Sequence, residues 1–218
     1  MLGIVSLSAQ MSQIASNPTP LYLDDCKSSA LPSWCNTAGT TGSLTYDSTY
    51  NCRISTVTTS QGVYYTLPAA SLKGAITLEV VHETVAFSGY APFIVELVDS
   101  TASSYVYINF DTFSSGQIRL YDYVTLLSQA TDSLGRVWRT TISLASGGSS
   151  KRFCVGVNSP TDHITDGAAG FNNLFISGQT AWADGNTIVP TIFSYAGSGG
   201  SDARTVRLYK VALHRGGA

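Results

Sequence analysis

Apolar and polar residues alternate over short segments through most of the chain. In residues 137–144, Trp138, Ile142 and Leu144 share one face, while polar residues take most of the other face, because successive side chains on a strand point to opposite sides. Residues 153–157 repeat this alternation after a turn that contains two glycines. The two segments therefore predict a β-hairpin with one apolar face, which a second sheet must cover.

Further segments of the same kind follow one another, separated by turns rich in Gly and Ser. The other predicted strands are residues 52–57, 62–67, 75–83, 92–99, 104–110, 117–123, 174–177 and 205–213. Residues 21–59 are rich in Ser, Thr, Asn and Gly, which indicates mostly irregular backbone with one or two short strands. Many short strands without amphipathic helices between them predict an all-β fold, an antiparallel β-sandwich of jelly-roll or concanavalin-like topology.

The first residues form a separate unit in the pattern. Residues 1–20 carry a nearly helical apolar stripe and end with Pro18 and Pro20, and two prolines so close together stop a helix or a central strand. We therefore expect an N-terminal arm over residues 1–20 and a single β-sandwich domain over residues 21–218. The arm docks either on its own domain or on a neighbouring subunit.

Charge is scarce in this sequence. Charged residues make up 12% of the chain and the formal net charge is −2, whereas soluble domains carry about 25% charged residues. A polar, nearly neutral surface suits an extracellular protein or a part of a large assembly. No basic run exceeds Lys151-Arg152, so nucleic acid is not an expected partner. No apolar run approaches the roughly 20 residues of a membrane helix, so membrane insertion is not expected either.

The cysteine residues leave two arrangements open. They are Cys26, Cys35, Cys52 and Cys154. No CxxC motif is present, so a structural zinc site is not expected. Either Cys26 pairs with Cys35 and Cys52 pairs with Cys154, or all four are free thiols.

No motif in the sequence specifies a catalytic reaction. There is no GxSxG motif and the three histidines are isolated. Glu79 and Glu83 lie too far apart along one strand to form a glycosidase pair, so we expect them to be solvated. Asp162 and Asp166 either hold Ca²⁺ in an oxygen-rich loop or belong to an ordinary surface turn. We expect neither a catalytic residue nor a cofactor, and a polysaccharide-degrading enzyme is the alternative.

Aromatic residues are the strongest candidates for ligand contact. They either stack on sugar rings, through their apolar faces, or fill the core or a subunit interface. Trp138 shares the apolar face of its strand, so we expect it in the core. Trp182 follows a Gly-Gln-Thr turn, so we expect it to be exposed. The predicted carbohydrate-binding residues are Trp182, Gln179 and Tyr195.

Three short motifs resemble a known group of domains. They are Gly135-Arg136-Val137-Trp138-Arg139, Phe175-Ile176-Ser177-Gly178-Gln179 and Val189-Pro190-Thr191. Together they are similar to motifs of the carbohydrate-binding-module-like jelly rolls of phage structural proteins, over about residues 130–195. Ser177-Gly178-Gln179 departs from the usual Gly-Ala-Gln of that group. The closing TVRLYKVALHRGG is similar to the last strand of concanavalin-like or laminin-G-like domains.

The resemblance implies a non-enzymatic protein on a phage virion surface, as a head decoration or spike or as part of a tail fibre. Its implied partners are other virion proteins, held through the N-terminal arm, and further copies of itself in a homo-oligomer. Its implied task is adhesion to glycans on the host surface. A free, secreted lectin-like module is the other binding function that the pattern allows.

Overall fold

The structure is a computed structural model of the 218-residue chain. The residues that it describes are 20–101, 104–111, 117–122, 125–131, 137–144, 151–158, 173–180 and 182–215. Residues 1–19, with almost all of the predicted arm, and the predicted calcium ligands Asp162 and Asp166 therefore lie outside the described residues.

One sheet contains eight strands in the order β13-β12-β11-β6-β15-β3-β2, with β1 paired to β15 as well. Its members are β1 (Pro20–Asp24), β2 (Ser43–Asp47), β3 (Cys52–Thr58), β6 (Ile76–Ser88), β11 (Val137–Leu144), β12 (Lys151–Asn158), β13 (Asn173–Thr180) and β15 (Ala203–Arg215). The predicted hairpin is confirmed, since β11 pairs antiparallel with β12.

The second sheet contains seven strands in the order β10-β9-β8-β7-β14-β4, with β5 paired to β14 as well. Its members are β4 (Gly62–Thr66), β5 (Ala70–Ser71), β7 (Phe93–Asp99), β8 (Ser104–Asp111), β9 (Gln117–Asp122), β10 (Thr125–Thr131) and β14 (Thr187–Tyr195).

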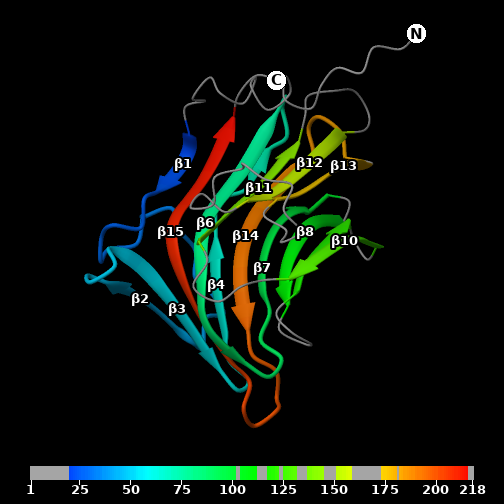
Figure 1. Ribbon diagram of the computed structural model, residues 1–218. Helices are drawn as coiled ribbons and strands as arrows, with labels where there is room; N and C mark the ends of the chain where they lie inside the picture. The colour runs from blue at the N-terminus through cyan, green and yellow to red at the C-terminus, as the bar shows by residue number, and fades with distance from the viewer. Residues whose placement is uncertain are drawn as a thin grey trace.

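The two sheets pack on one another as layers (Figure 1). A large apolar cluster lies between them, with a smaller cluster of Val57, Val63, Ala91 and Ala196 beside it. The core side chains come from alternate positions of strands in both sheets, such as Leu78 and Val80 of β6, and Val106 and Ile108 of β8. All described pairings between the named strands are antiparallel, and no described residue is helical. The predicted antiparallel β-sandwich is confirmed. The described part of the chain also has no helix that is long and apolar enough to span a membrane.

Strand β14 lies inside the seven-stranded sheet, although the sequence pattern did not predict a strand there. Pro190 obscures it, because proline lacks the N–H that a central strand normally donates. Along β14, Ile188 pairs with β5 and Thr191 with β4, so Pro190 lies where one partner strand gives way to the next. The Pro190 carbonyl accepts the Leu67 N–H on that side. The missing N–H therefore faces the break between β4 and β5, where it interrupts no ladder.

Trp182 is buried, so the exposed position expected for it is wrong. Its side chain is only 2% exposed and belongs to the same core cluster as Trp138, which is fully buried as expected. The indole Nε1–H donates to Ser104 Oγ at 2.6 Å, which satisfies the polar edge of a ring that the core surrounds. The turn residues around Trp182 indicated a surface loop, but the loop folds its aromatic side chain inward.

The thiols of Cys26, Cys35 and Cys52 are free. Neither of the two disulfides considered from the sequence is therefore formed, while the side chain of Cys154 lies outside the described side chains. Burial raises the pKa of the Cys35 thiol to about 11 and that of Cys26 further. Both thiols are consequently protonated and unreactive at neutral pH.

Replacing Trp182 by alanine should destabilise the fold. Removal of a buried tryptophan usually costs about 3–5 kcal/mol, because it leaves a cavity and removes apolar contacts. We expect a loss of this size in the free energy of unfolding, measured by urea denaturation. The control is Tyr50→Ala, because Tyr50 is 51% exposed and its loss should cost less than about 1 kcal/mol. Equal losses for the two variants would contradict the burial of Trp182.

Candidate functional site

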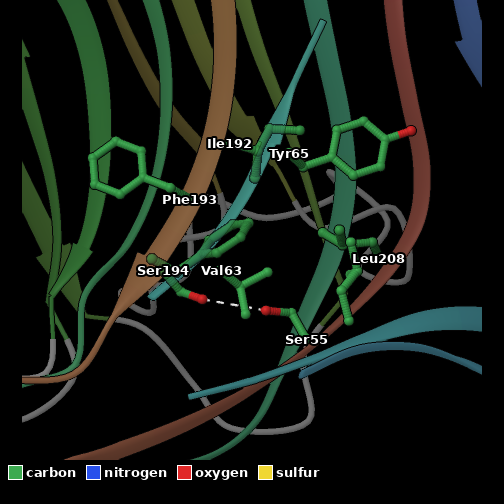
Figure 2. A pocket seen from close by; sticks show the side chains of 9 residues that line it. Ser55, Val63, Tyr65, Ile192, Phe193, Ser194 and Leu208 are labelled. Carbon is green, nitrogen blue, oxygen red and sulfur yellow. Dashed lines mark hydrogen bonds between the residues drawn. The ribbon is translucent and has the colours of Figure 1, made fainter. Parts of the chain in front are cut away.

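The outer face of the seven-stranded sheet carries a group of aromatic side chains that do not enter the core. Side chains alternate along each strand, so the apolar residues of β14 that point inward leave Phe193 and Tyr195 on the outside. Figure 2 shows the Phe193 ring pointing away from Ile192 and Val63, which lie between the sheets. We call this group the aromatic face; it consists of Tyr64, Tyr90, Tyr105, Tyr107, Phe193 and Tyr195.

The strand register brings outer side chains from distant parts of the sequence into rows across the sheet. Phe193 pairs with Tyr64 on one side and Ile94 on the other, and Ile94 pairs with Asn109, which pairs with Arg119. Directly opposed side chains in an antiparallel sheet have Cβ atoms about 4.5–5.5 Å apart. These five residues therefore form one continuous row across five strands.

A second row lies beside the first. Thr191 of β14 pairs with Thr66 of β4 and with Glu96 of β7, and Glu96 pairs with Tyr107 of β8. Residues on neighbouring rows are diagonal neighbours, with Cα atoms about 7–8 Å apart. Glu96 is thus diagonal to Phe193 on one side and to Asn109 on the other.

The rings of the aromatic face contact one another at one end of the sheet. The Tyr64 and Phe193 centroids lie 5.7 Å apart with ring planes 18° from parallel, and the Phe193 and Tyr195 centroids lie 6.2 Å apart at 17°. Tyr90 closes the group, since its hydroxyl is 2.8 Å from the Tyr195 hydroxyl. All four rings are partly exposed. They form a rigid apolar surface with hydroxyl groups at its edge.

Glu96 is the unusual polar group on this face. Its side chain is half-buried, and among the described residues its carboxyl group has neither a hydrogen-bond donor nor a cation as a partner. Burial, which penalises the charged form, raises the pKa of Glu96 to about 7. The protonated and ionised forms of the carboxyl group are therefore both populated at neutral pH.

Asn109, diagonal to Glu96, also keeps an unused polar atom. The residue is 9% exposed, and its Oδ1 is a buried atom without a hydrogen-bond partner among the described residues. Buried side-chain oxygens are usually hydrogen-bonded, so such an exception is open to a further donor, for example a water molecule or a hydroxyl of a ligand. Glu96 and Asn109 together offer three acceptor oxygens beside the aromatic rings.

The cavity between the sheets is too small for a ligand. It is lined by residues of both layers, among them Leu44, Val63 and Leu208, and by Ser55 and Ser194, whose hydroxyls lie 3.2 Å apart (Figure 2). The space open to a water molecule is about 10 Å³, near the minimum for a single water. This cavity belongs to the core.

Other buried acidic groups are fully paired, in contrast to Glu96. Glu79 and Glu83 are 5% and 9% exposed, so the solvated positions expected for them are wrong. Glu79 accepts hydrogen bonds from Arg139 and Lys210, with His214 Nε2 3.1 Å away. Burial alone would raise the pKa of Glu79, but the hydrogen bonds from His214 and Lys210 and the charges of Arg139 and Lys210 outweigh burial and lower it to about 2.

Asp24 is paired in the same way between the sheets. Arg53 donates to both of its carboxylate oxygens, and the Tyr65 hydroxyl donates at 2.6 Å. Burial opposes ionisation of Asp24, yet the hydrogen bonds from Arg53 and Tyr65 outweigh it, so its pKa is lowered. Asp24 and Glu79 therefore have structural roles, and their carboxylate oxygens are used by these contacts.

The three carbohydrate-binding residues predicted from the sequence do not lie together in one described site. Tyr195 lies on the aromatic face, Trp182 lies in the core, and the side chain of Gln179 lies outside the described side chains. Sequence reasoning missed Glu96 and Phe193. The alternation of Phe193 and Tyr195 was a usable signal, but Pro190 hid the strand that carries it.

No cluster of three or more His, Cys, Asp or Glu residues in the described part of the chain could hold a metal ion. Asp162 and Asp166 are not among those residues, so calcium binding by their loop is still a prediction.

Solved structures of lectin domains share this architecture. The chain matches the Emp47p carbohydrate recognition domain with a TM-score of 0.60 and 13% identity, over 89% of this chain and 94% of that one. It matches lectin II from Ulex europaeus with a TM-score of 0.59 and 10% identity, over 88% and 97%. Peanut lectin matches with a TM-score of 0.61 and 12% identity, over 88% and 95%.

Sequence comparison adds no family assignment. No protein-family profile matches the chain, and no curated protein sequence matches it either. At identities this low the structural likeness establishes the fold alone. The chain thus has the concanavalin-like β-sandwich fold of the legume lectins.

Proposed function

We propose that this protein is a non-enzymatic, glycan-binding module and that the aromatic face is its binding surface. The observation that carries the proposal is the group of partly exposed rings, Tyr64, Phe193 and Tyr195. On the same sheet face lie polar atoms of Glu96 and Asn109 that have no hydrogen-bond partner among the described residues. The solved structures with the same fold include a carbohydrate recognition domain and seed lectins, which supports binding rather than hydrolysis.

The composition of the aromatic face fits a sugar. One face of a pyranose ring presents C–H groups, which pack on an aromatic ring, while its hydroxyls need hydrogen-bond partners. Ligand sites typically combine apolar and aromatic lining with a few well-placed polar groups. Here the rings supply the apolar contact, the carboxyl group of Glu96 lies one row away from Phe193, and Asn109 lies in the same row as Phe193. Recognition of this kind needs little net charge, in agreement with the charge-poor sequence.

Phe193 provides the direct test of the binding surface. Phe193→Ala should weaken glycan binding at least tenfold, equivalent to about 1.4 kcal/mol. The reason is that Phe193 is the ring that contacts both Tyr64 and Tyr195. Phe193→Tyr keeps the ring and should retain binding. The measurement is a glycan array followed by calorimetric titration of the strongest hit.

Tyr50→Ala serves as the matched control, because Tyr50 is an exposed aromatic residue that packs on Arg207 of the other sheet. It should bind like the wild type. The absence of any glycan signal from the wild-type chain would overturn the proposed function. Equal binding by Phe193→Ala and the wild type would overturn the placement of the site.

We further propose that the module acts on a phage virion surface, as a homo-oligomer held to other virion proteins by its N-terminal arm. The support is the similarity of the segments 135–139, 175–179 and 189–191 to phage jelly-roll proteins. Strand β1 begins at Pro20 and pairs with β15, so removal of residues 1–19 leaves the described sandwich complete.

Deletion of residues 1–19 should abolish incorporation into virus particles and leave the unfolding midpoint of the domain unchanged. The domain does not need the arm for any of its described strand pairings, which is the physical reason for the second expectation. The measurement compares the amount of full-length and shortened chain in purified particles. Equal incorporation would reject the role of the arm.

A further inference from the structure

Glu96 occupies a position that the fold alone does not explain. Its in-register neighbours on the outer face are Thr191 and Tyr107, and neither forms a hydrogen bond with its carboxyl group among the described residues. Among the buried carboxylates, Asp24 and Glu79 each accept several hydrogen bonds from cationic side chains, and Asp99 and Asp202 accept hydrogen bonds from an amide side chain or from backbone N–H groups. Glu96 is thus left half-buried without the partners that make such a position favourable.

The unpaired carboxyl group lowers the stability of the fold at high pH. Because the folded-state pKa of about 7 lies above the usual value of 4.5, the unfolded chain loses this proton more readily than the folded chain. Stability that is present below pH 4.5 is therefore lost as the pH rises through 7. Groups that reduce stability are often retained for function.

We propose that Glu96 is the hydroxyl acceptor of the glycan site, and that it selects neutral sugars with two adjacent free hydroxyl groups over acidic sugars. This inference rests on the proposed function. It adds a ligand class and a pH response to that function.

The carboxylate of Glu96 is a suitable hydrogen-bond acceptor for two sugar hydroxyls. A carboxylate has two oxygens on one planar group and can accept two donors side by side, and such charge-assisted hydrogen bonds are stronger than neutral ones. Phe193 lies diagonally across from Glu96 on β14, and Asn109 lies diagonally across on β8. A sugar ring packed on Phe193 would reach the carboxylate with adjacent hydroxyls, and a further hydroxyl would reach the unpaired Asn109 Oδ1.

On the neighbouring strands β14 and β8, no side chain that faces Glu96 is acidic or basic, so its carboxylate determines the local charge. On β14 the facing side chains are Val189, Thr191 and Phe193, which do not titrate. On β8 they are the phenols Tyr105 and Tyr107, and Arg119 of β9 lies two strands away from Glu96. A carboxylate or sulfate on the sugar would meet the Glu96 charge at short distance, so acidic glycans should be rejected.

Binding should weaken as the pH falls, because only the ionised carboxyl group accepts two hydroxyls. With a pKa of about 7, the ionised fraction of Glu96 falls about tenfold between pH 8 and pH 6. The apparent affinity is the intrinsic affinity multiplied by the competent fraction. We therefore expect about a tenfold loss of affinity over this range.

The test compares the wild type with Glu96→Gln and Glu96→Asp. A glycan array with neutral, sialylated and uronate-containing glycans is probed first, and the strongest neutral hit is then titrated by calorimetry at pH 8, 7 and 6. The wild type should bind neutral glycans and show the tenfold loss. Glu96→Gln should bind at pH 8 at least as weakly as the wild type does at pH 6, without pH dependence and with a smaller penalty for acidic glycans. Glu96→Asp keeps the charge and should keep the pH dependence.

Folding is checked on the same variants. Glu96→Gln removes a carboxylate that destabilises the fold above pH 7, so its unfolding free energy at pH 8 should equal or exceed that of the wild type. This inference would be overturned if the wild type and Glu96→Gln bound the glycan equally well and without pH dependence. The proposed function would still stand in that case, provided that Phe193→Ala lost binding. Wild-type preference for acidic glycans would overturn the inference as well.

Discussion

The register of β14 between β7 and β4 is the constraint on which both the core and the candidate site depend. Side chains alternate along a strand, so a slip of one residue would exchange the inward and outward sets. In the observed register Ile188 and Ile192 enter the core, and the energy of burying such side chains fixes the pairing. The same register places Phe193 beside Tyr64 and Ile94 on the outside. Core packing therefore positions the aromatic face.

Buried charge is handled in two different ways in this molecule. The eight-stranded sheet pairs its acidic side chains with cations, as in the contacts of Glu79 with Arg139 and Lys210 and of Glu83 with Arg207. These contacts hold neighbouring strands together and lower the pKa of Glu79. In the seven-stranded sheet, Glu96 has no hydrogen-bond or ion-pair partner in the described part of the chain, and burial raises its pKa. One sheet thus uses its carboxylates for structure, while the other keeps a carboxylate available on its surface.

A nearly neutral surface is compatible with this arrangement. Charged residues are 12% of the chain, and many of those described are used in pairs, such as Arg53 with Asp24. Contact through aromatic rings and unpaired acceptors acts over short distances and does not depend on long-range attraction. Such a surface discriminates by shape and hydrogen bonding, which is what a neutral sugar offers.

The sequence by itself determined the fold class and much of the core. Alternation in β6, β7, β8 and β11 identified which side chains point inward, since a two-residue period has a direct geometric meaning. It was less informative where local signals conflicted with tertiary contacts. Pro190 hid β14, because a break between two partner strands that tolerates proline exists only in the assembled sheet. Trp182 was assigned to the surface from its turn residues, although the loop directs it into the core.

The candidate site was decided almost entirely by the tertiary structure. The sequence predicted that Tyr195 contacts a ligand. It did not predict the other residues of the candidate site, Tyr64, Phe193, Glu96 and Asn109, which come from four different strands. Their proximity arises from pairings between segments far apart in the chain, which no local pattern encodes. Whether a carboxyl group is paired, as in Glu79, or unpaired, as in Glu96, depends on side chains contributed by neighbouring strands. The sequence determines the alternation of side chains, and only the folded sheets determine which of them meet.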